Sequence, residues 1–133
     1  MTINDEDKKS LIKHRLVQAE ETIEDVRLLI KNNRLRSAVN RIYYGMFYSL
    51  LALGLDSQFN ASKHTRLIGW FNKNFIHEGL LDARYGRIIN KAFNRRNKGD
   101  YDAYVRFEKG IVIEMFDEMQ EFIAAIKKRI EIN

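Results

Sequence analysis

The sequence predicts an all-α protein, and three observations lead to that prediction. Its 133 residues contain no proline, the residue that most often interrupts helices and begins turns. Leu, Ile, Lys, Arg and Glu, which favour helices, are abundant. Apolar residues recur at steps of three and four, which is the helical spacing. We therefore expect residues 1–133 to form a single domain, an up-and-down bundle of five helices with a four-helix core.

The central helix of this bundle is expected within residues 37–55. Its one charged side chain is Arg41, and from Ile42 onward apolar and aromatic residues occupy every side of the helix. A helix that is apolar all round is one enclosed by other helices. A membrane span needs roughly 20 apolar residues, and this run is interrupted by polar residues near Asn40 and at Asp56. We expect no contact with a membrane.

A first long helix is expected before the central one, ending at Asn32 and Asn33. Residues 1–9 are polar and are expected to be frayed, although Asp5 and its acidic neighbours suit a helix start. A short turn then makes the first two helices antiparallel neighbours. The apolar stripe of the first helix consists of Ile12, Leu16, Ala19, Ile23, Val26 and Ile30.

Two further helices are expected after the polar loop that follows Gly54. The third runs from a cap at Ser62 to about Ile76. The fourth begins near Leu81 or Asp82, with apolar residues on one side and basic residues on the other. The expected inner faces consist of Leu67, Ile68, Phe71 and Phe75 in the third helix and Tyr85, Ile88, Ile89, Ala92 and Phe93 in the fourth.

The last helix is expected to be long and to follow a break at Gly99. Asp100 or Asp102 is its expected cap. Its apolar positions are Val105, Val112, Met115, Met119, Phe122, Ile126 and Ile130, and an acidic cluster expected to face outward consists of Glu114, Asp117, Glu118 and Glu121.

The net charge of +5 is concentrated in one segment. Residues 84–98 contain six basic and no acidic side chains, and 5 − 6 leaves −1 for the rest of the chain. Such a segment is typical of a phosphate-binding face, although a solvated basic face has the same composition. The six residues are Arg84, Arg87, Lys91, Arg95, Arg96 and Lys98.

The junction between the fourth and fifth helices, Arg95–Tyr101, is a candidate site with two interpretations. Basic residues near a helix C-terminus stabilise the helix dipole, so the segment is explained as an ordinary helix end. Alternatively the guanidinium groups bind phosphates, while Tyr101 or Tyr104 stacks on a base.

Arg41 is a second candidate, because a charge at the edge of so apolar a segment must be paired or exposed. We favour a structural role, in which Arg41 bonds Asp100 or Asp102. The alternative is that Arg41 points into the cleft faced by the basic helix.

Other chemical signatures are missing from the sequence. His64, beside Lys63, is the kind of histidine that usually caps or packs, and the three histidines lack metal-ligand spacing, so no metal and no cofactor are expected. There is no glycine-rich phosphate loop and no nucleophile elbow. The absence of cysteine and of a signal-like N-terminus favours the reducing cytoplasm.

Three segments taken together resemble a known family. Ala38–Phe47, then Lys63 with His64, then Arg96–Asp102 before a long final helix are similar in order and spacing to HEPN domain proteins. The likeness covers about residues 11–130, and is to the small stand-alone bacterial and archaeal branch encoded beside minimal nucleotidyltransferases. It implies a helical bundle that dimerises, brings two copies of the polar motif into one cleft, and often acts as the ribonuclease toxin of a toxin–antitoxin pair.

The chain departs from this family at one position that matters for catalysis. Catalytic HEPN ribonucleases carry a His four to six residues after the motif Arg, and no His follows His77 here. Five residues after Arg96 stands Tyr101, and five after Arg95 stands Asp100. A phenol with a pKa of about 10 is a poor base at neutral pH. His64 supplies an imidazole only if the third helix folds toward the cleft.

Three hypotheses follow. The leading one is a homodimeric HEPN protein that binds RNA or a nucleotide in a basic cleft and is the toxin-like partner of a nucleotidyltransferase. The second is a metal-independent endoribonuclease using Arg96 with Tyr101, Asp100 or His64. The third is a helical interaction protein without a nucleic-acid role. The surplus of aromatic residues, with 8 Phe and 6 Tyr, indicates either an interface or a full core.

Overall fold

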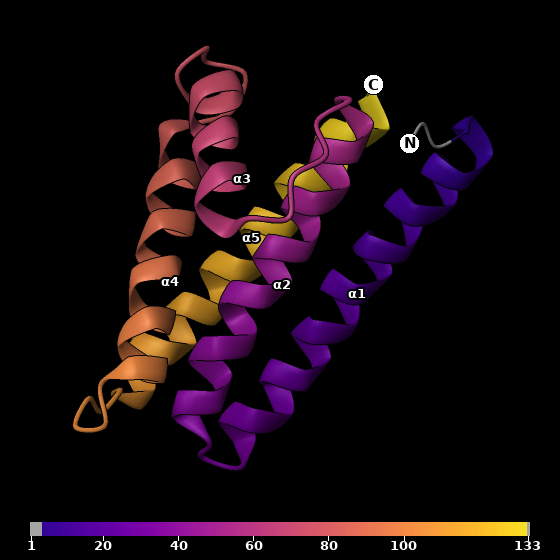
Figure 1. Ribbon diagram of the computed structural model, residues 1–133. Helices are drawn as coiled ribbons and strands as arrows, with labels where there is room; N and C mark the ends of the chain where they lie inside the picture. Colours follow the sequence, from indigo (N-terminus) through magenta and orange to yellow (C-terminus); the bar gives the residue numbers. More distant parts are fainter. Residues whose placement is uncertain (1–3, 133) are drawn as a thin grey trace.

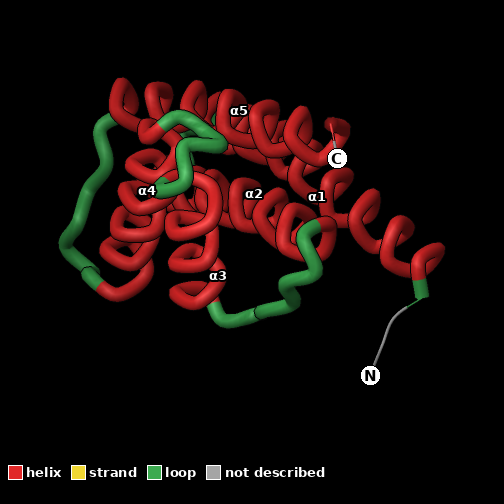
Figure 2. The backbone as a smooth tube through the Cα atoms, turned by 90° about the horizontal axis from the view of Figure 1, so that it is seen from above, coloured by secondary structure: helices red, strands yellow, loops and turns green. Residues whose placement is uncertain are grey.

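The computed structural model describes residues 4–132, and the regular structure within them is helical throughout (Figures 1 and 2). Long helices lie side by side, and the shorter third helix lies beside the fourth. This arrangement confirms the all-α bundle of five helices. The elements are α1 (Asp5–Lys31), α2 (Leu35–Asp56), α3 (His64–Phe71), the π-helical turn η1 (Asn72–Ile76), α4 (Ala83–Tyr101) and α5 (Lys109–Ile132).

Helix α1 begins earlier than the sequence suggested. The side chain of Asn4 accepts a hydrogen bond of 2.8 Å from the backbone N–H of Asp7, and three acidic residues occupy the first turn. An N-cap and negative charge both stabilise a helix start. Residues 1–9 were expected to be frayed, but residues 5–9 are helical. Residues 1–3 lie outside the described residues.

Helix α2 is the centre of the bundle, as predicted. It packs against α1, α3, α4 and α5 (Figure 1). The turn from α1 is tight because Asn33 adopts a positive φ of 59°, a conformation that asparagine tolerates. The buried residues of α2 are Ala38, Val39, Ile42, Tyr43, Gly45, Met46, Phe47, Ser49, Leu50, Ala52, Leu53 and Gly54.

Helix α3 starts at His64, and its N-cap is Lys63, which makes no side-chain capping bond. The prediction that Ser62 is the cap is therefore wrong. The helix continues as η1, in which the backbone N–H of His77 donates to the carbonyl of Asn72 at 2.8 Å. The expected helical span to about Ile76 is confirmed, but its last turn is wider than an α-helical turn.

Helix α4 begins as predicted, with Asp82 as its cap, but it does not end at Gly99. The helix continues to Tyr101, and Gly99 is buried inside it. A Cβ atom on Gly99 would lie 3.2 Å from the Phe107 ring, so this glycine permits a close approach to the following loop. Since α5 begins only at Lys109, neither predicted aspartate caps it.

The loop that precedes α5 also differs from expectation. Val105, assigned from sequence to the last helix, lies in the loop before it. The apolar face from Val112 to Ile126 is buried as predicted. Phenylalanine is buried or half-buried at every position, so the Phe side chains belong to the core of this chain, whereas Tyr101 and Tyr104 are exposed.

Two helical glycines provide a test of the packing with opposite expected signs. A Cβ on Gly54 would lie 2.7 Å from the carbonyl oxygen of Phe59, whereas a Cβ on Gly69 meets no atom within 4 Å. We expect Gly54→Ala to lower the free energy of unfolding by about 1–3 kcal/mol, because the backbone must move. Gly69→Ala should raise it by about 0.5–1 kcal/mol through helix propensity. Urea unfolding measures both, and a stabilising Gly54→Ala would contradict the packing described.

Candidate functional site

Arg96 of α4 lies against aromatic side chains of α2 and of its own helix. Its Cζ is 5.0 Å from the centre of the Tyr43 ring, 5.5 Å from Tyr44 and 5.6 Å from Phe93. Such contacts are cation–π interactions, which gain strength as water is excluded. The Arg96 side chain is only 11% exposed, so its charge is held at the edge of the core.

Asp100 and Asn40 complete the polar contacts of this arginine. Arg96 Nη1 donates to Asp100 Oδ2 at 3.3 Å, one helical turn away, and Asn40 Nδ2 lies 3.3 Å from both Asp100 carboxylate oxygens. Burial works against the charged guanidinium, but the bond to Asp100 and the neighbouring tyrosines outweigh it and raise the pKa of Arg96. Its Nε is buried and lacks a hydrogen-bond partner among the described residues.

His64, the first residue of α3, reaches the same place from another direction. Its Nδ1 is 2.6 Å from the Tyr43 hydroxyl, and its ring stacks on Phe47 with centroids 4.1 Å apart. Burial, and then the charge of Arg96, lower the pKa of His64. Burial raises the pKa of Tyr43 beyond its ordinary value of 10.0. At neutral pH the imidazole and the phenol are therefore both neutral.

These residues form one unit, the Arg96 cluster, defined as Arg96, Asp100, Asn40, Tyr43 and His64. The third helix does fold toward the motif, because Tyr43 contacts both His64 and Arg96. The cluster thus brings a guanidinium, which suits a phosphate, and a neutral imidazole, which suits proton transfer, into contact with one tyrosine.

Tyr101 and Tyr104 lie outside this cluster. Tyr101 is the last residue of α4 and is 82% exposed, and Tyr104 is 93% exposed in the following loop. No described contact joins either ring to Arg96. The residue five positions after the motif arginine therefore projects into solvent, and the imidazole nearest to that arginine in space is His64.

Arg41 does not bond Asp100 or Asp102, so that prediction is wrong. Its guanidinium donates to the Tyr48 hydroxyl at 3.2 Å and lies 5.3 Å from the centre of the Tyr44 ring. Arg41 points along α2 because these two tyrosines, one turn apart, offer it a face and an acceptor.

Arg36 was missed from the sequence and takes the role expected of Arg41. It donates to the Gly99 carbonyl, to the Asp102 carbonyl at 3.3 Å and to the Val105 carbonyl at 2.6 Å. These bonds fix the end of α4 and the following loop against the start of α2. Its position one turn before Asn40 is the only sequence signal of this role.

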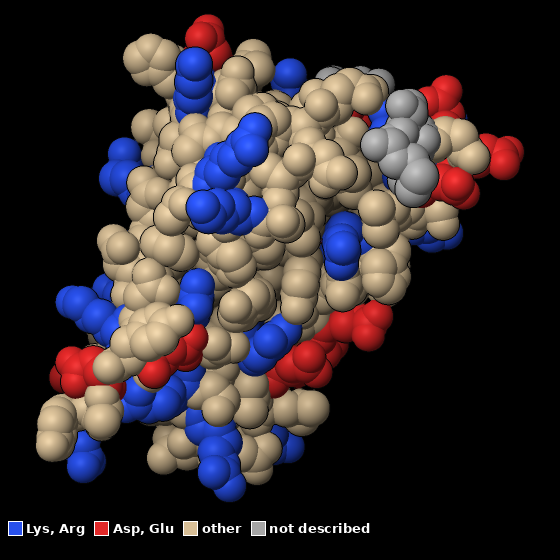
Figure 3. Space-filling view, viewed as in Figure 1, with Lys and Arg blue, Asp and Glu red and all other residues tan. Residues whose placement is uncertain are grey.

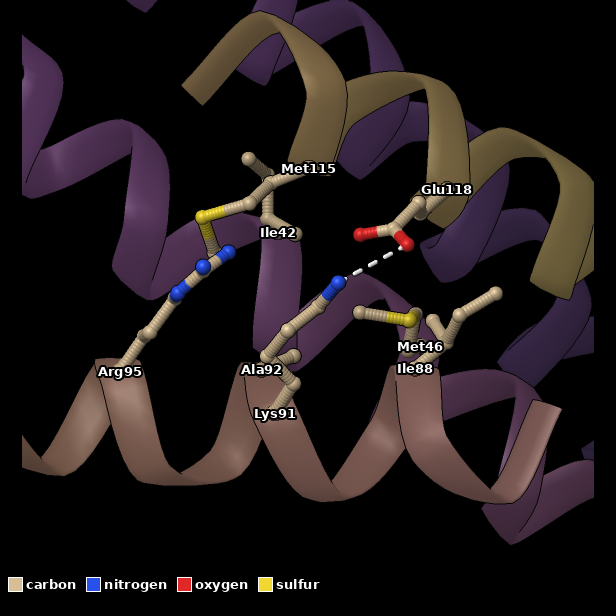
Figure 4. A pocket seen from close by; sticks show the side chains of 8 residues that line it. All are labelled: Ile42, Met46, Ile88, Lys91, Ala92, Arg95, Met115 and Glu118. Atoms are coloured by element: carbon tan, nitrogen blue, oxygen red, sulfur yellow. Dashed lines mark hydrogen bonds and ion pairs between the residues drawn. The ribbon is translucent and has the colours of Figure 1, made fainter. Parts of the chain in front are cut away.

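The basic side of α4 is partly neutralised by α5. Arg84 forms an ion pair with Glu121, and Lys91 Nζ is 3.0 Å from Glu118 Oε2 (Figure 4). Glu114, Asp117 and Glu121 are exposed as expected and Glu118 is half-buried, and both Glu118 and Glu121 reach across to α4. Figure 4 also shows Arg95 extending beside Met115 at the seam of α2, α4 and α5, where no space for a water molecule remains.

Three basic residues of α4, namely Arg87, Arg95 and Lys98, have no ion pair among the described residues. Together with Lys91, Asn90 and Asn94 they line a hollow on the outer side of the helix. We call this lining the basic stripe. Figure 3 shows basic side chains over the side of the molecule where α4 runs, with acidic ones mixed among them near the loop after α4.

The fold and the site together define a class of protein. This is a small all-α domain in which Arg96 and Asp100 of the fourth helix contact Tyr43 and Asn40 of the second. The family model described as HEPN domain matches residues 12–130, so the chain belongs to the HEPN family.

Relatives of this chain cover most of its length. A UPF0332 protein of Thermotoga maritima is 38% identical over 125 residues, which are 94% of this chain and 95% of the relative. "Putative toxin MJ0605" of Methanocaldococcus jannaschii is 36% identical over 113 residues, 85% of this chain and 84% of the relative. "Putative toxin MJ0142" of the same organism is 38% identical over 92 residues, 69% and 63% of the two chains. The family and the toxin-named relatives are those that the sequence motifs indicated.

Two features are absent from the described residues, a membrane-spanning helix and a metal-binding cluster. None of the described helices combines the length and apolar character needed to cross a bilayer. Residues 4–132 contain no group of three His, Cys, Asp or Glu side chains arranged to hold a metal ion.

The pKa of His64 tests the electrostatics of the cluster. In the folded protein the pKa of His64 lies below the ordinary value of 6.5, so on acidification the unfolded chain binds the proton before the folded chain does. The free energy of unfolding therefore falls as the pH drops below about 6.5. Since Arg96 contributes to the shift, Arg96→Gln should raise the pKa of His64. NMR titration of the His64 ring measures it.

Arg95→Gln is the matched control, because it removes the same charge from the neighbouring residue of α4, which does not contribute to the shift. An unchanged His64 pKa in Arg96→Gln, or an equal rise in both variants, would contradict the arrangement.

Proposed function

We propose that this HEPN protein binds RNA or a nucleotide through the basic stripe on α4. The observation that carries the proposal is the composition of the hollow, which is lined by four basic side chains and two asparagines and by no carboxylate. Lys91 is paired with Glu118, but the other three cations are available to an anion. Phosphates on a nucleic acid match this charge, and the asparagine amides supply further donors.

We further propose that the protein is the toxin-like partner of a nucleotidyltransferase in the cytoplasm and that it acts as a homodimer. The toxin-named relatives support the toxin-like role. The absence of cysteine favours a reducing compartment. The resemblance to the branch encoded beside minimal nucleotidyltransferases is the basis for the partner and for the dimer.

Charge reversal on the stripe tests binding. The triple variant Arg87→Glu, Arg95→Glu and Lys98→Glu should abolish detectable binding to a single-stranded RNA at 100 mM salt. Losing three phosphate contacts lowers the magnitude of the slope of log K against log salt concentration by about 2, since each contact contributes roughly 0.7 on a single strand. Fluorescence anisotropy at 100 mM salt measures the loss of binding, and titrations at lower salt, where residual binding is detectable, give the salt dependence.

The control is Lys13→Glu, Lys127→Glu and Lys128→Glu, three exposed residues on α1 and α5. Each triple variant changes the net charge by the same amount, from +5 to −1 (5 − 6 = −1). Equal loss in both variants, or equal affinity of the wild-type protein for RNA and for heparin, would replace the proposal by a helical interaction module that attracts polyanions through net charge alone.

A second candidate function, metal-independent RNA cleavage, is favoured by the contact of both His64 and Arg96 with Tyr43. In the tautomer whose Nδ1–H donates to the Tyr43 oxygen, Nε2 of His64 is a free base. It would take the proton of a 2′-hydroxyl as the O2′–P bond forms and the P–O5′ bond breaks, with Arg96 stabilising the phosphate. Tyr43 itself is excluded as the base, because burial keeps it protonated.

This second function predicts cleavage in the presence of EDTA that leaves 2′,3′-cyclic phosphate ends. Arg96→Ala and His64→Ala should each lower the cleavage rate by about 100-fold, the scale of a general base or an electrostatic stabiliser. His14→Ala is the matched histidine control, because His14 lies on α1, outside the Arg96 cluster, and is exposed. An RNA pool left intact by the wild-type protein would rule this function out.

A further inference from the structure

A second hollow, of about 750 Å³, lies between η1 and α4. Helix α4 comes close to η1 here because Gly86 has no side chain. A Cβ on Gly86 would lie 2.8 Å from Asn72 Oδ1 and 3.3 Å from two side-chain carbons of Ile76. The volume is in the range of small-ligand sites. Its lining consists of Asn72, Lys73, Ile76, His77, Ala83, Gly86, Arg87 and Asn90.

The lining combines three kinds of chemistry. Ile76, Ala83 and Gly86 provide an apolar surface, while Lys73 and Arg87 provide positive charge. The asparagine amides provide donors and acceptors, since Asn72 Nδ2 donates to Asn90 Oδ1 at 3.3 Å and their remaining amide atoms have no other described bond. An apolar surface beside paired amides suits a nucleobase, whose faces are apolar and whose edges carry donors and acceptors.

This hollow adjoins the basic stripe, because Arg87 and Asn90 line both. From Arg87 the stripe continues with Lys91, Arg95 and Lys98 at steps of four, four and three residues. Four residues of α-helix rise by about 6 Å. A row of cations at that spacing follows a phosphate chain and leads away from the hollow along α4.

We propose that the hollow between η1 and α4 is a nucleobase site, and that the ligand of this protein is therefore a single-stranded oligonucleotide. One unpaired base lies in the hollow while the phosphates that follow it lie along the basic stripe. This inference rests on the proposed binding function and narrows its substrate class. A duplex does not fit it, because paired bases present neither their faces nor their Watson–Crick edges. A mononucleotide would use only the first cation of the row.

The test compares two ligands of equal length and charge, the deoxyribonucleotide dT8 and an abasic deoxyribose-phosphate 8-mer, both measured by fluorescence anisotropy at 100 mM salt. We expect the wild-type protein to bind dT8 about five-fold more tightly than the abasic chain, a modest value for contact with one base. Asn90→Ala should reduce that ratio to about one. Asn94→Ala, one turn further along α4 and in the basic stripe alone, should leave the ratio unchanged.

The possible outcomes separate this inference from the function on which it rests. If neither ligand binds while the single-stranded RNA does, the base site is refuted; if the RNA does not bind either, the proposed function fails and the base site with it. If the wild-type protein binds both ligands equally, the stripe is a phosphate site and the base site is refuted. Equal ratios in Asn90→Ala and in the wild type also refute it.

A second variant protects the test against misfolding of the first. Ala83 is exposed at the first position of α4, and a larger apolar side chain there narrows the hollow without removing a contact. We expect Ala83→Leu to lower the affinity for dT8 to that of the abasic chain while circular dichroism remains that of the wild type. Retained preference for dT8 in a folded Ala83→Leu variant overturns the assignment.

Discussion

The burial of most of α2 is the constraint on which the rest of this structure depends. A helix so rich in apolar residues is stable in water only when other helices cover it, and α1, α3, α4 and α5 cover all but one half-exposed stripe, which contains Arg41, Tyr44, Tyr48, Leu51 and Leu55. Gly45 shows how close this packing is, because a Cβ there would contact Met119 of α5 and lie 3.2 Å from Thr22 of α1. The bundle is therefore assembled around one helix, and the position of α4 follows from the surface that α2 presents to it.

That same burial explains why the polar motif forms a cluster. Tyr43 is fully buried in α2, and a buried hydroxyl without a hydrogen bond costs about 1–3 kcal/mol. His64 of α3 satisfies the hydroxyl, and the Arg96 guanidinium covers the ring from α4. Asp100 then offsets the charge of the arginine, and Asn40 holds the carboxylate. The candidate site and the packing of three helices are thus the same set of contacts, so substitutions within the Arg96 cluster are expected to lower stability whatever their effect on function.

Most of the helices were predictable from the sequence, because periodicity and a lack of proline act locally. The positions at which the helices begin and end were less predictable. Gly99 was expected to stop α4, yet the helix continues, and the loop after it packs so closely that a Cβ on Gly99 would lie 3.2 Å from the Phe107 ring. For a related reason, Arg36 and not Arg41 bonds the loop after α4. Both arginines stand near the start of α2, and only the three-dimensional path of the loop decides which of them reaches its carbonyl groups. The contact of His64 with Tyr43 likewise depended on the direction of α3.

Arg95 and Arg96 were treated alike in the sequence, but the helix separates them by about 100°. Arg95 lines the outer hollow of α4 without an ion pair, whereas Arg96 is nearly buried, paired with Asp100 and enclosed by rings. A phosphate at Arg95 gains a charge partner at little cost. A phosphate at Arg96 has to displace a carboxylate and enter a partly dry site, and it gains mainly the one unpaired Nε. Affinity for a polyanion is therefore expected from the stripe, and discrimination or chemistry from the Arg96 cluster, so we expect different roles for the two adjacent arginines.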